Sequence, residues 1–442
     1  MTAMFLPENV RLCMETLVQN NFKAYAVGGC VRDTMLGLQP HDYDLCTDAT
    51  TEEMIRLFSD RSLVRSGERH GTVGVVVNGD VVEITTFRTE GGYEDGRHPD
   101  WVRFVSNVEE DLARRDFTVN AMAYAPVQGY VDPFGGEEDL KKGILRTVGD
   151  PTARFSEDAL RILRGVRFAV RYHLSVDPDT RVAMETLAPT MKKLANERVF
   201  DELCKLLPCV AAEDLLAFAP ILTVVLPELA PSVGFLQHNP HHLYDVFTHT
   251  AHVVEATHPS LALRWAALLH DCGKPATFFL DENGRGHFHG HAQVSAKMAD
   301  AALLRLKAPN ALRKRVVFLI EQHMTLLPPD KRVLRRWLGK YGSEAVAELL
   351  ALQEADFCSK GVIGDTKAFE LLHGLLNEVL AEEDCLQIKD LQVDGRDLQA
   401  LGFPTGPLMG KCLAWLLEQV QDESIPNEKD ALLDAAAAYK EK

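Results

Sequence analysis

The stretch AVGGCVRDTMLGLQPHDYDLCTDA, residues Ala26–Ala49, combines a glycine pair with two aspartates spaced i, i+2. Alternate side chains of an extended strand share a face, so Asp42 and Asp44 are expected to project together. Adjacent carboxylates repel and raise each other's pKa, and a divalent cation such as Mg²⁺ reverses that penalty. Upstream, Gly28 and Gly29 let the backbone approach a phosphate closely. The stretch predicts a metal-and-phosphate site, although a turn and a solvated acidic loop would also produce this pattern.

A third carboxylate is expected on a neighbouring strand. Residues 71–87, GTVGVVVNGDVVEITTF, predict a β-hairpin that turns at Asn78-Gly79. On its second strand Val82 and Ile84 mark one face, so Glu83 lies on the opposite face, within reach of a strand that carries the aspartates. We therefore take Glu83 as the candidate that completes a two-metal site.

Composition indicates a globular chain that is large enough for two to four domains. It has 442 residues, of which 46% are hydrophobic and 25% charged. No apolar run approaches the roughly 20 residues that a membrane span needs, and the N-terminal segment lacks the pattern of a targeting signal. The nine cysteines include no CxxC pair, which favours reduced thiols. We expect a cytoplasmic protein that is not bound to a membrane.

The net charge of −17 argues against broad contact with nucleic acid, whose phosphates bind lysine and arginine. A basic run between residues 313 and 340 is the exception. It supplies four candidate RNA contacts, which are Arg313, Lys314, Arg335 and Arg336. A solvated helix face explains the same run equally well.

Six ordered blocks connect the chain to a known family. They are GGCVRD, HDYDLCTDA, RRDFTVNAMAY (Arg114–Tyr124), DPFGGEEDL (Asp132–Leu140), EDALR (Glu157–Arg161) and NERVFDEL (Asn196–Leu203). Together they resemble the class II tRNA nucleotidyltransferases, which are the bacterial-type CCA-adding enzymes and their poly(A) polymerase relatives. Residues 391–420 are similar to the tail of the same enzymes.

The resemblance implies an α+β chain of four parts. A polymerase-beta-like nucleotidyltransferase head would occupy residues 1–145. A neck and body for nucleotide selection and RNA binding would occupy 146–232, an HD domain 233–360 and a helical tail 361–442. The chain after the head is expected to be mostly α-helical, as the apolar spacing from Ser156 onward indicates. The sequence indicates no oligomeric state.

The resemblance also implies the reaction, which is template-independent addition of C, C and A to the tRNA 3′ end from CTP and ATP. Asp42 and Asp44 would bind Mg²⁺ ions that activate the 3′-hydroxyl and bridge the triphosphate. The implied nucleotide-binding residues are Gly28, Gly29, Arg32, Arg114, Asp116, Asp158, Arg161 and Arg164. Addition of A alone, or of poly(A), stays open as an alternative.

Selection of C and A is expected from Asp158 and Arg161. With Ser156 as N-cap, these two residues would share one face of a helix. A carboxylate that accepts beside a guanidinium that donates matches cytosine and adenine, whereas uracil and guanine present the reverse pattern. A local ion pair is the simpler reading. The glycine-containing segment Arg88–Trp101 is expected to be a mobile loop that helps to switch from C to A.

A second candidate site lies in a histidine-dense region, since eleven of the sixteen histidines fall between His238 and His323. The order of ligands resembles the HD-domain metal-dependent phosphohydrolases. Six residues are candidate ligands of a divalent metal of open identity: His249, His270, Asp271, His291, His323 and Asp356. The resemblance implies phosphatase or 2′,3′-cyclic phosphodiesterase activity, either as an accessory function or, with the head as an RNA-docking module, as the main one. An HD fold that keeps these residues only for stability is the alternative.

Overall fold

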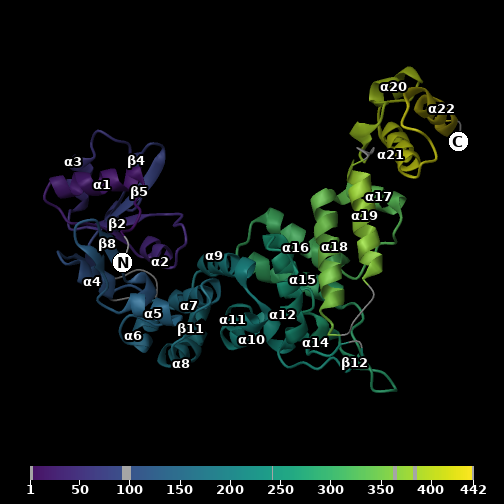
Figure 1. The fold of residues 1–442 in the computed structure, drawn as a ribbon. Helices are drawn as coiled ribbons and strands as arrows, with labels where there is room; N and C mark the ends of the chain where they lie inside the picture. The colour runs from purple at the N-terminus through teal and green to yellow at the C-terminus, as the bar shows by residue number, and fades with distance from the viewer. Residues whose placement is uncertain (1–2, 92–100, 241, 362–365, 382–385, 441–442) are drawn as a thin grey trace. The chain divides into compact units, whose positions relative to one another are not determined.

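The computed structural model describes residues 3–91, 101–240, 242–361, 366–381 and 386–440 (Figure 1). The chain forms two compact units, one of residues 1–210 with 217–227 and the other of residues 211–216 with 228–442. In the described residues no helix is both long enough and apolar enough to cross a membrane. The cysteines in these ranges are free thiols.

The first unit is built on a seven-stranded sheet with the strand order β3-β4-β5-β2-β1-β8-β9. Its strands are β1 (Ala24–Val27), β2 (Asp44–Thr47), β3 (Leu63–Val64), β4 (Thr72–Val77), β5 (Asp80–Thr86), β8 (Ala123–Ala125) and β9 (Gly129–Val131). Strands β2 and β5 run parallel, and the other neighbours in this sheet are antiparallel. The strand that begins at Asp44 is therefore central.

The predicted hairpin is confirmed. Strands β4 and β5 pair with Val77 opposite Asp80, and the turn residues Asn78 and Gly79 have φ angles of 54° and 91°. Positive φ at both positions is what a tight turn between twisted strands requires. A separate ribbon pairs β6 (Arg88–Gly91) with β7 (Trp101–Phe104). In the expected mobile loop, Arg88–Trp101, the first four residues and Trp101 belong to these strands, and residues 92–100 lie outside the described residues.

Helices complete the first unit, and α1 packs against β1, β2 and β5. They are α1 (Glu8–Gln19), α2 (Gly29–Met35), α3 (Thr51–Leu57), α4 (Val108–Ala113), α5 (Gly136–Lys142), α6 (Pro151–Glu157), α7 (Leu160–Arg171), α8 (Pro178–Leu187), α9 (Asn196–Leu206) and α11 (Ala219–Val225). The short strands β10 (Ile144–Leu145) and β11 (Ser175–Val176) pair in parallel. A mixed sheet followed by helices confirms the predicted α+β class.

The predicted N-cap at Ser156 is wrong. Asp150 caps α6 by accepting a hydrogen bond from the Ala153 N–H, and Pro151 opens the helix, so Ser156 lies near its end. Asp158 is extended, with φ −144° and ψ 105°, between α6 and α7. The Asp-Pro pair, a strong helix start, outcompetes the serine six residues later.

The second unit is almost entirely helical. Its helices are α10 (Ala212–Ala217), α12 (Val246–Ala256), α13 (Leu261–Leu269), α14 (Lys274–Thr277), α15 (His291–Arg305), α16 (Asn310–Gln322), α17 (Lys331–Tyr341), α18 (Ser343–Cys358), α19 (Lys367–Ala381), α20 (Gly395–Ala400), α21 (Pro407–Gln421) and α22 (Lys429–Lys440). One hairpin, β12 (Phe279–Leu280) with β13 (Gly286–His287), interrupts them. Leu334 and Leu350 belong to one core cluster, whereas Leu398 and Leu416 belong to a second, in the tail.

Gly136 provides a test of packing in the first unit. A Cβ atom there would lie 2.2 Å from the Thr118 carbonyl oxygen, and backbone cannot move aside cheaply. We expect Gly136→Ala to lower the free energy of unfolding by about 1–3 kcal/mol, measured by denaturant titration. Gly410→Ala is the control, because a Cβ atom at this helical position would have no heavy atom within 4 Å. Alanine also favours a helix over glycine, so the free energy of unfolding should stay the same or rise. Equal stability of the two variants would contradict this account.

Candidate functional site

The sheet register brings three predicted carboxylates together. Asp44 pairs with Val27 of β1, and the parallel pairing of Leu45 with Ile84 sets β5 beside β2. As a result, Asp42, Asp44 and Glu83 line one cavity of about 750 Å³. Their metal-binding roles stay predictions.

Electrostatics at this cavity suit a cation. Partial burial raises the pKa of Asp44; Arg115 opposes the rise, and the charges of Glu83 and Asp42 add to it. Crowded carboxylates gain from a bound divalent ion, because its charge removes their repulsion. The oxygen donor set also fits Mg²⁺.

A second cavity, of about 730 Å³, carries the positive charge that the chain as a whole lacks. Asp42 and Asp44 also line it, together with Gly28 and Gly29. Eight arginines and one lysine line it against five aspartates: Arg32, Arg114, Arg115, Arg161, Arg164, Arg167, Arg171, Arg198 and Lys205. The predicted nucleotide-binding residues therefore gather here, and the excess of cations suits a polyphosphate.

The glycine pair fits this cavity for a definite reason. Gly28 has a φ of 76°, and a Cβ atom there would lie 2.8 Å from Nη1 of Arg115. Arg115 thus lies against the turn, where its guanidinium also pairs with Asp111 at 3.4 Å. A side chain at position 28 would therefore displace the Arg115 guanidinium from the cavity.

Neighbouring side chains fix the orientation of Arg32. Its guanidinium donates to Asp33 Oδ1 at 2.7 and 2.9 Å and to Asn120 Oδ1, and it lies 4.2 Å from the ring centroid of Tyr172. Arg32 is buried. A buried guanidinium held on several sides is preorganised to bind an anion.

Asp116, which the resemblance implies as a nucleotide-binding residue, pairs with Arg164. Arg164 donates from Nε and Nη2 to Asp116 Oδ2 at 2.8 and 2.7 Å, and Asn120 donates to Oδ1 at 3.1 Å. Burial by itself would raise the pKa of Asp116, but Arg164 and Asn120 hold it at about 2. Asp116 is therefore an ionised anchor that positions Arg164.

The structure places Asp158 and Arg161 on one cavity, but each holds a different partner. Asp158 Oδ2 accepts from Nη2 of Arg198 at 2.7 Å, and its Oδ1 accepts from the Leu160 N–H. Arg161 pairs with Glu157 and donates to the Arg114 carbonyl at 3.2 Å. The local Asp158–Arg161 ion pair considered from the sequence is not among the described contacts.

Sequence reasoning missed several basic residues of this cavity, namely Arg115, Arg167, Arg171, Arg198 and Lys205. A signal was available for part of the set. Arginines in EDALRILRGVRFAVR recur every three or four residues, which places them along one stripe of α7. The contributions of α9 could not be found this way, because they depend on packing between helices.

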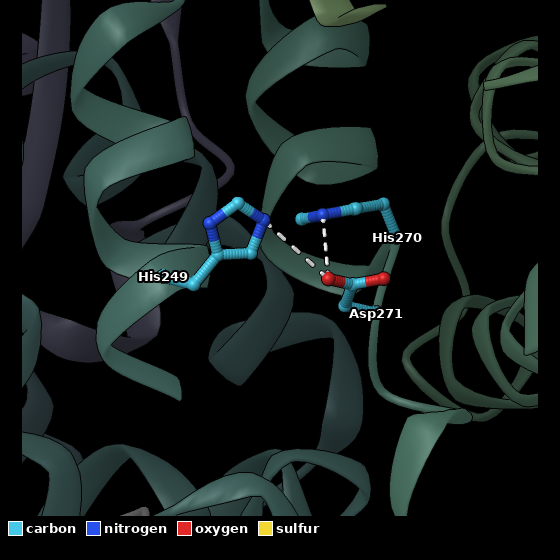
Figure 2. A group of neighbouring side chains, drawn as sticks. All are labelled: His249, His270 and Asp271. Atoms are coloured by element: carbon cyan, nitrogen blue, oxygen red, sulfur yellow. Dashed lines mark ion pairs between the residues drawn. The ribbon is translucent and has the colours of Figure 1, made fainter. Parts of the chain in front are cut away.

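In the second unit, the six HD candidates meet at one buried cluster. Two groups, each with ligand atoms within 4.8 Å of one another, share Asp271; one adds His249 and His270, and the other adds His291 and His323. Figure 2 shows His249 and His270 turned toward the Asp271 carboxylate, at 3.5 and 3.1 Å. Asp356 accepts from His249 at 2.9 Å.

The chemistry of this cluster fits a metal. His270 Nε2 and both carboxylate oxygens of Asp271 are buried and make no hydrogen bond of good geometry in the described part of the chain, although Lys274 Nζ forms an ion pair with Asp271 Oδ2 at 2.7 Å. Such atoms are costly without a ligand. Burial and the charge of His270 lower the pKa of His323 to about 4, so this ring is neutral at pH 7, as a ligand must be.

Acidic neighbours engage the basic run. Arg313 pairs with Asp300 at 2.7 Å, Arg335 with Glu423 at 2.7 Å and Arg336 with Asp422 at 2.6 Å, while Lys314 is exposed. The pairs of Arg335 and Arg336 join α17 to the end of α21. Contact of this run with RNA stays a prediction.

Comparison with known proteins gives the family. Residues 24–146 match the model of the poly A polymerase head domain, residues 173–232 that of a probable RNA and SrmB-binding site of polymerase A, and residues 288–436 that of a putative tRNA nucleotidyltransferase domain 2. The CCA-adding enzyme of Levilactobacillus brevis is 35% identical over 431 residues, 97% of each chain. The chain belongs to the family of CCA-adding enzymes. The CCA-adding enzyme of Leuconostoc mesenteroides is 50% identical to this chain over 186 residues, which are 42% of this chain and 46% of that enzyme.

Solved CCA-adding enzymes share the fold. The Bacillus stearothermophilus CCA-adding enzyme in complex with CTP superposes with a TM-score of 0.74 and 28% identity, covering 99% of this chain and 98% of that one. The Thermotoga maritima CCA-adding enzyme complexed with tRNA has a TM-score of 0.55 and 19% identity, over 97% of this chain and 94% of its own. The second likeness concerns the fold alone.

The Asp116–Arg164 pair predicts a pH-dependent stability. A carboxyl whose pKa is near 2 in the folded chain and near 3.8 in the unfolded chain stabilises the fold above pH 4 by about 2 kcal/mol. This contribution is lost as the pH falls toward 2. We expect Asp116→Asn to lower the free energy of unfolding at pH 7 by about that amount, and the difference from wild type to shrink between pH 4 and pH 3. A difference that does not change with pH would contradict the assignment.

Proposed function

We propose that this chain adds CCA to the 3′ end of tRNA from CTP and ATP. It is an enzyme of the CCA-adding family, with 35% identity to a relative of that name over nearly its full length. The observation that carries the proposal is the junction of two cavities at Asp42 and Asp44, where an acidic trio borders a cavity rich in arginine. That junction suits a triphosphate held beside a cation.

The residues divide the work by charge. Asp42 and Asp44, with Glu83 as third carboxylate, would hold Mg²⁺, which when bound neutralises the triphosphate and acidifies the primer hydroxyl. Arg32 and Arg115 bind phosphate oxygens, and Gly28 leaves room for them to approach. Pyrophosphate then leaves from the same basic surface.

Base selection rests on Asp158 and Arg161. Asp158 would accept a hydrogen bond from the exocyclic amino group of the base, and Arg161 would donate one to the ring nitrogen. To do so, each must share or release its present partner, which is Arg198 for Asp158 and Glu157 for Arg161. Each matched polar pair contributes roughly 1–3 kcal/mol of discrimination, so two suffice to suppress UTP and GTP strongly. The ion pairs keep both groups satisfied between substrates.

The acidic pair is tested by Asp42→Asn and Asp44→Asn. We expect each to reduce CTP incorporation into tRNA lacking CCA by at least about 100-fold, roughly 2.7 kcal/mol, because the cation site is lost. Affinity for tRNA should change by less than about twofold, and Glu52→Gln, an exposed change in α3, should behave as wild type. Full incorporation by both variants would refute the site.

The same assay separates the alternatives in specificity. Transcripts that end one, two or three nucleotides before the mature terminus are offered each triphosphate separately, and the products are sequenced. Addition of C to the shortest transcript supports the CCA activity. Addition of A alone, or of a long A tract, supports an A-adding enzyme or a poly(A) polymerase.

A second proposal concerns the second unit, where the buried cluster around Asp271 favours a metal-dependent phosphohydrolase. The six HD residues would hold a divalent metal, which when bound supplies a nucleophilic hydroxide near neutral pH. We propose this activity as an accessory to nucleotide addition. The alternative, in which it is the main activity, predicts negligible nucleotide addition. A cytoplasmic location, where the cysteines stay reduced, is also proposed.

Substitution of His270 and Asp271 tests this centre. Wild type should purify with a divalent metal, and EDTA should lower its melting temperature. We expect His270→Ala and Asp271→Asn to abolish both the metal content and this effect of EDTA, while CTP incorporation stays within about twofold of wild type. Retention of metal by both variants, measured by elemental mass spectrometry, would contradict the assignment.

A further inference from the structure

Three flat rings lie in contact along the hairpin of the second unit. The rings of Phe279 and His287 stack with centroids 5.3 Å apart, and those of His287 and His289 stack at 5.6 Å. Phe279 and His289 are 5.4 Å apart. Phe279 is 45% exposed, and Asp281 accepts a hydrogen bond from His287 Nε2 at 2.8 Å, which fixes that ring. We call these three residues the ring ladder.

The ladder is not what holds the hairpin in place. The residues that alternate with the ladder face the interior of the unit. The ring of Phe278 packs against those of Phe235 and Phe288, with centroids 5.2 and 5.4 Å apart. Gly286 fits here because it has no side chain, since a Cβ atom at this position would lie only 2.1 Å from the Gln237 carbonyl oxygen. The inner rings and this close approach anchor the hairpin, which leaves the outer rings available to a ligand.

Two of the three ring-ladder residues border the HD cluster. His287 and His289 line a cavity of about 320 Å³ together with the buried Asp271, His291 and Asp356. Lys274 and Lys360 line the same cavity, where Lys274 pairs with Asp271 at 2.7 Å and Lys360 with Asp356 at 3.8 Å. An aromatic surface thus meets a site whose metal ligands and cations suit a phosphate ester.

We propose that the ring ladder is a stacking platform for the terminal nucleobase of an RNA whose 3′-phosphate ester enters the HD cavity. The proposal rests on the phosphohydrolase function proposed above. Stacking engages the face common to all bases, so the platform binds a 3′-terminal nucleotide with little regard to its identity. The platform then favours phosphate esters that carry a nucleobase over free inorganic or polyol phosphates.

Two cyclic phosphodiesters test the platform with the full-length, metal-loaded protein. Adenosine 2′,3′-cyclic monophosphate carries a base, and glycerol 1,2-cyclic phosphate does not. We expect Phe279→Ala and His289→Ala to raise KM for the adenosine ester by about 5- to 100-fold and to leave kcat/KM for the glycerol ester within twofold. Phe279→Tyr keeps a ring and should keep the wild-type KM. Leu280→Ala, at an exposed neighbouring position of the same hairpin, is the matched control.

A binding measurement separates this proposal from the one it rests on. Stacking should quench the fluorescence of ethenoadenosine 2′,3′-cyclic monophosphate in wild type even when EDTA is present, and Phe279→Ala should abolish the quenching. Quenching without hydrolysis of either ester would support the platform and refute the phosphohydrolase. Absence of quenching, or equal losses with both esters in the Phe279 and His289 variants, would overturn the platform.

Discussion

The register between β2 and β5 is the constraint on which the head depends. Strand β2 runs antiparallel to β1 and parallel to β5, so the end of β2 that carries Asp44 lies beside both the glycine turn after β1 and Glu83 on β5. A shift of one residue would turn every side chain of β2 to the other face. Buried Leu45 and Ile84 hold the register, because exposing them would cost a few kcal/mol.

Local patterns in the sequence were sufficient where the chemistry is local. Asn78-Gly79 specifies its turn because both residues tolerate positive φ, and the alternation around Glu83 follows from the strand period. The order of the candidate metal ligands also predicted residues that meet in one cluster. In each case the signal lies within a few residues or in the order of rare side chains.

Long-range partners were not accessible from the sequence. The contact of Arg198 with Asp158 joins α9 to the segment before α7, and no spacing rule predicts it. Ser156 resembled an N-cap, yet Asp150-Pro151 starts the helix first. The stacking of Phe279, His287 and His289 depends on a hairpin whose strands are only two residues long, too short for a clear period-two pattern.

The arginine-lined cavity has a consequence for how the protein meets its anions. At physiological ionic strength, charges more than about 8 Å apart in solvent are largely screened from each other. The chain's net charge of −17 is therefore hardly felt by a phosphate that has reached the eight arginines and one lysine. At low ionic strength the acidic remainder of the surface repels the same phosphate from farther away. Lowering the salt concentration thus strengthens the binding of a phosphate in the cavity but slows its association with the protein. The binding strength and the association rate therefore depend on salt in opposite directions.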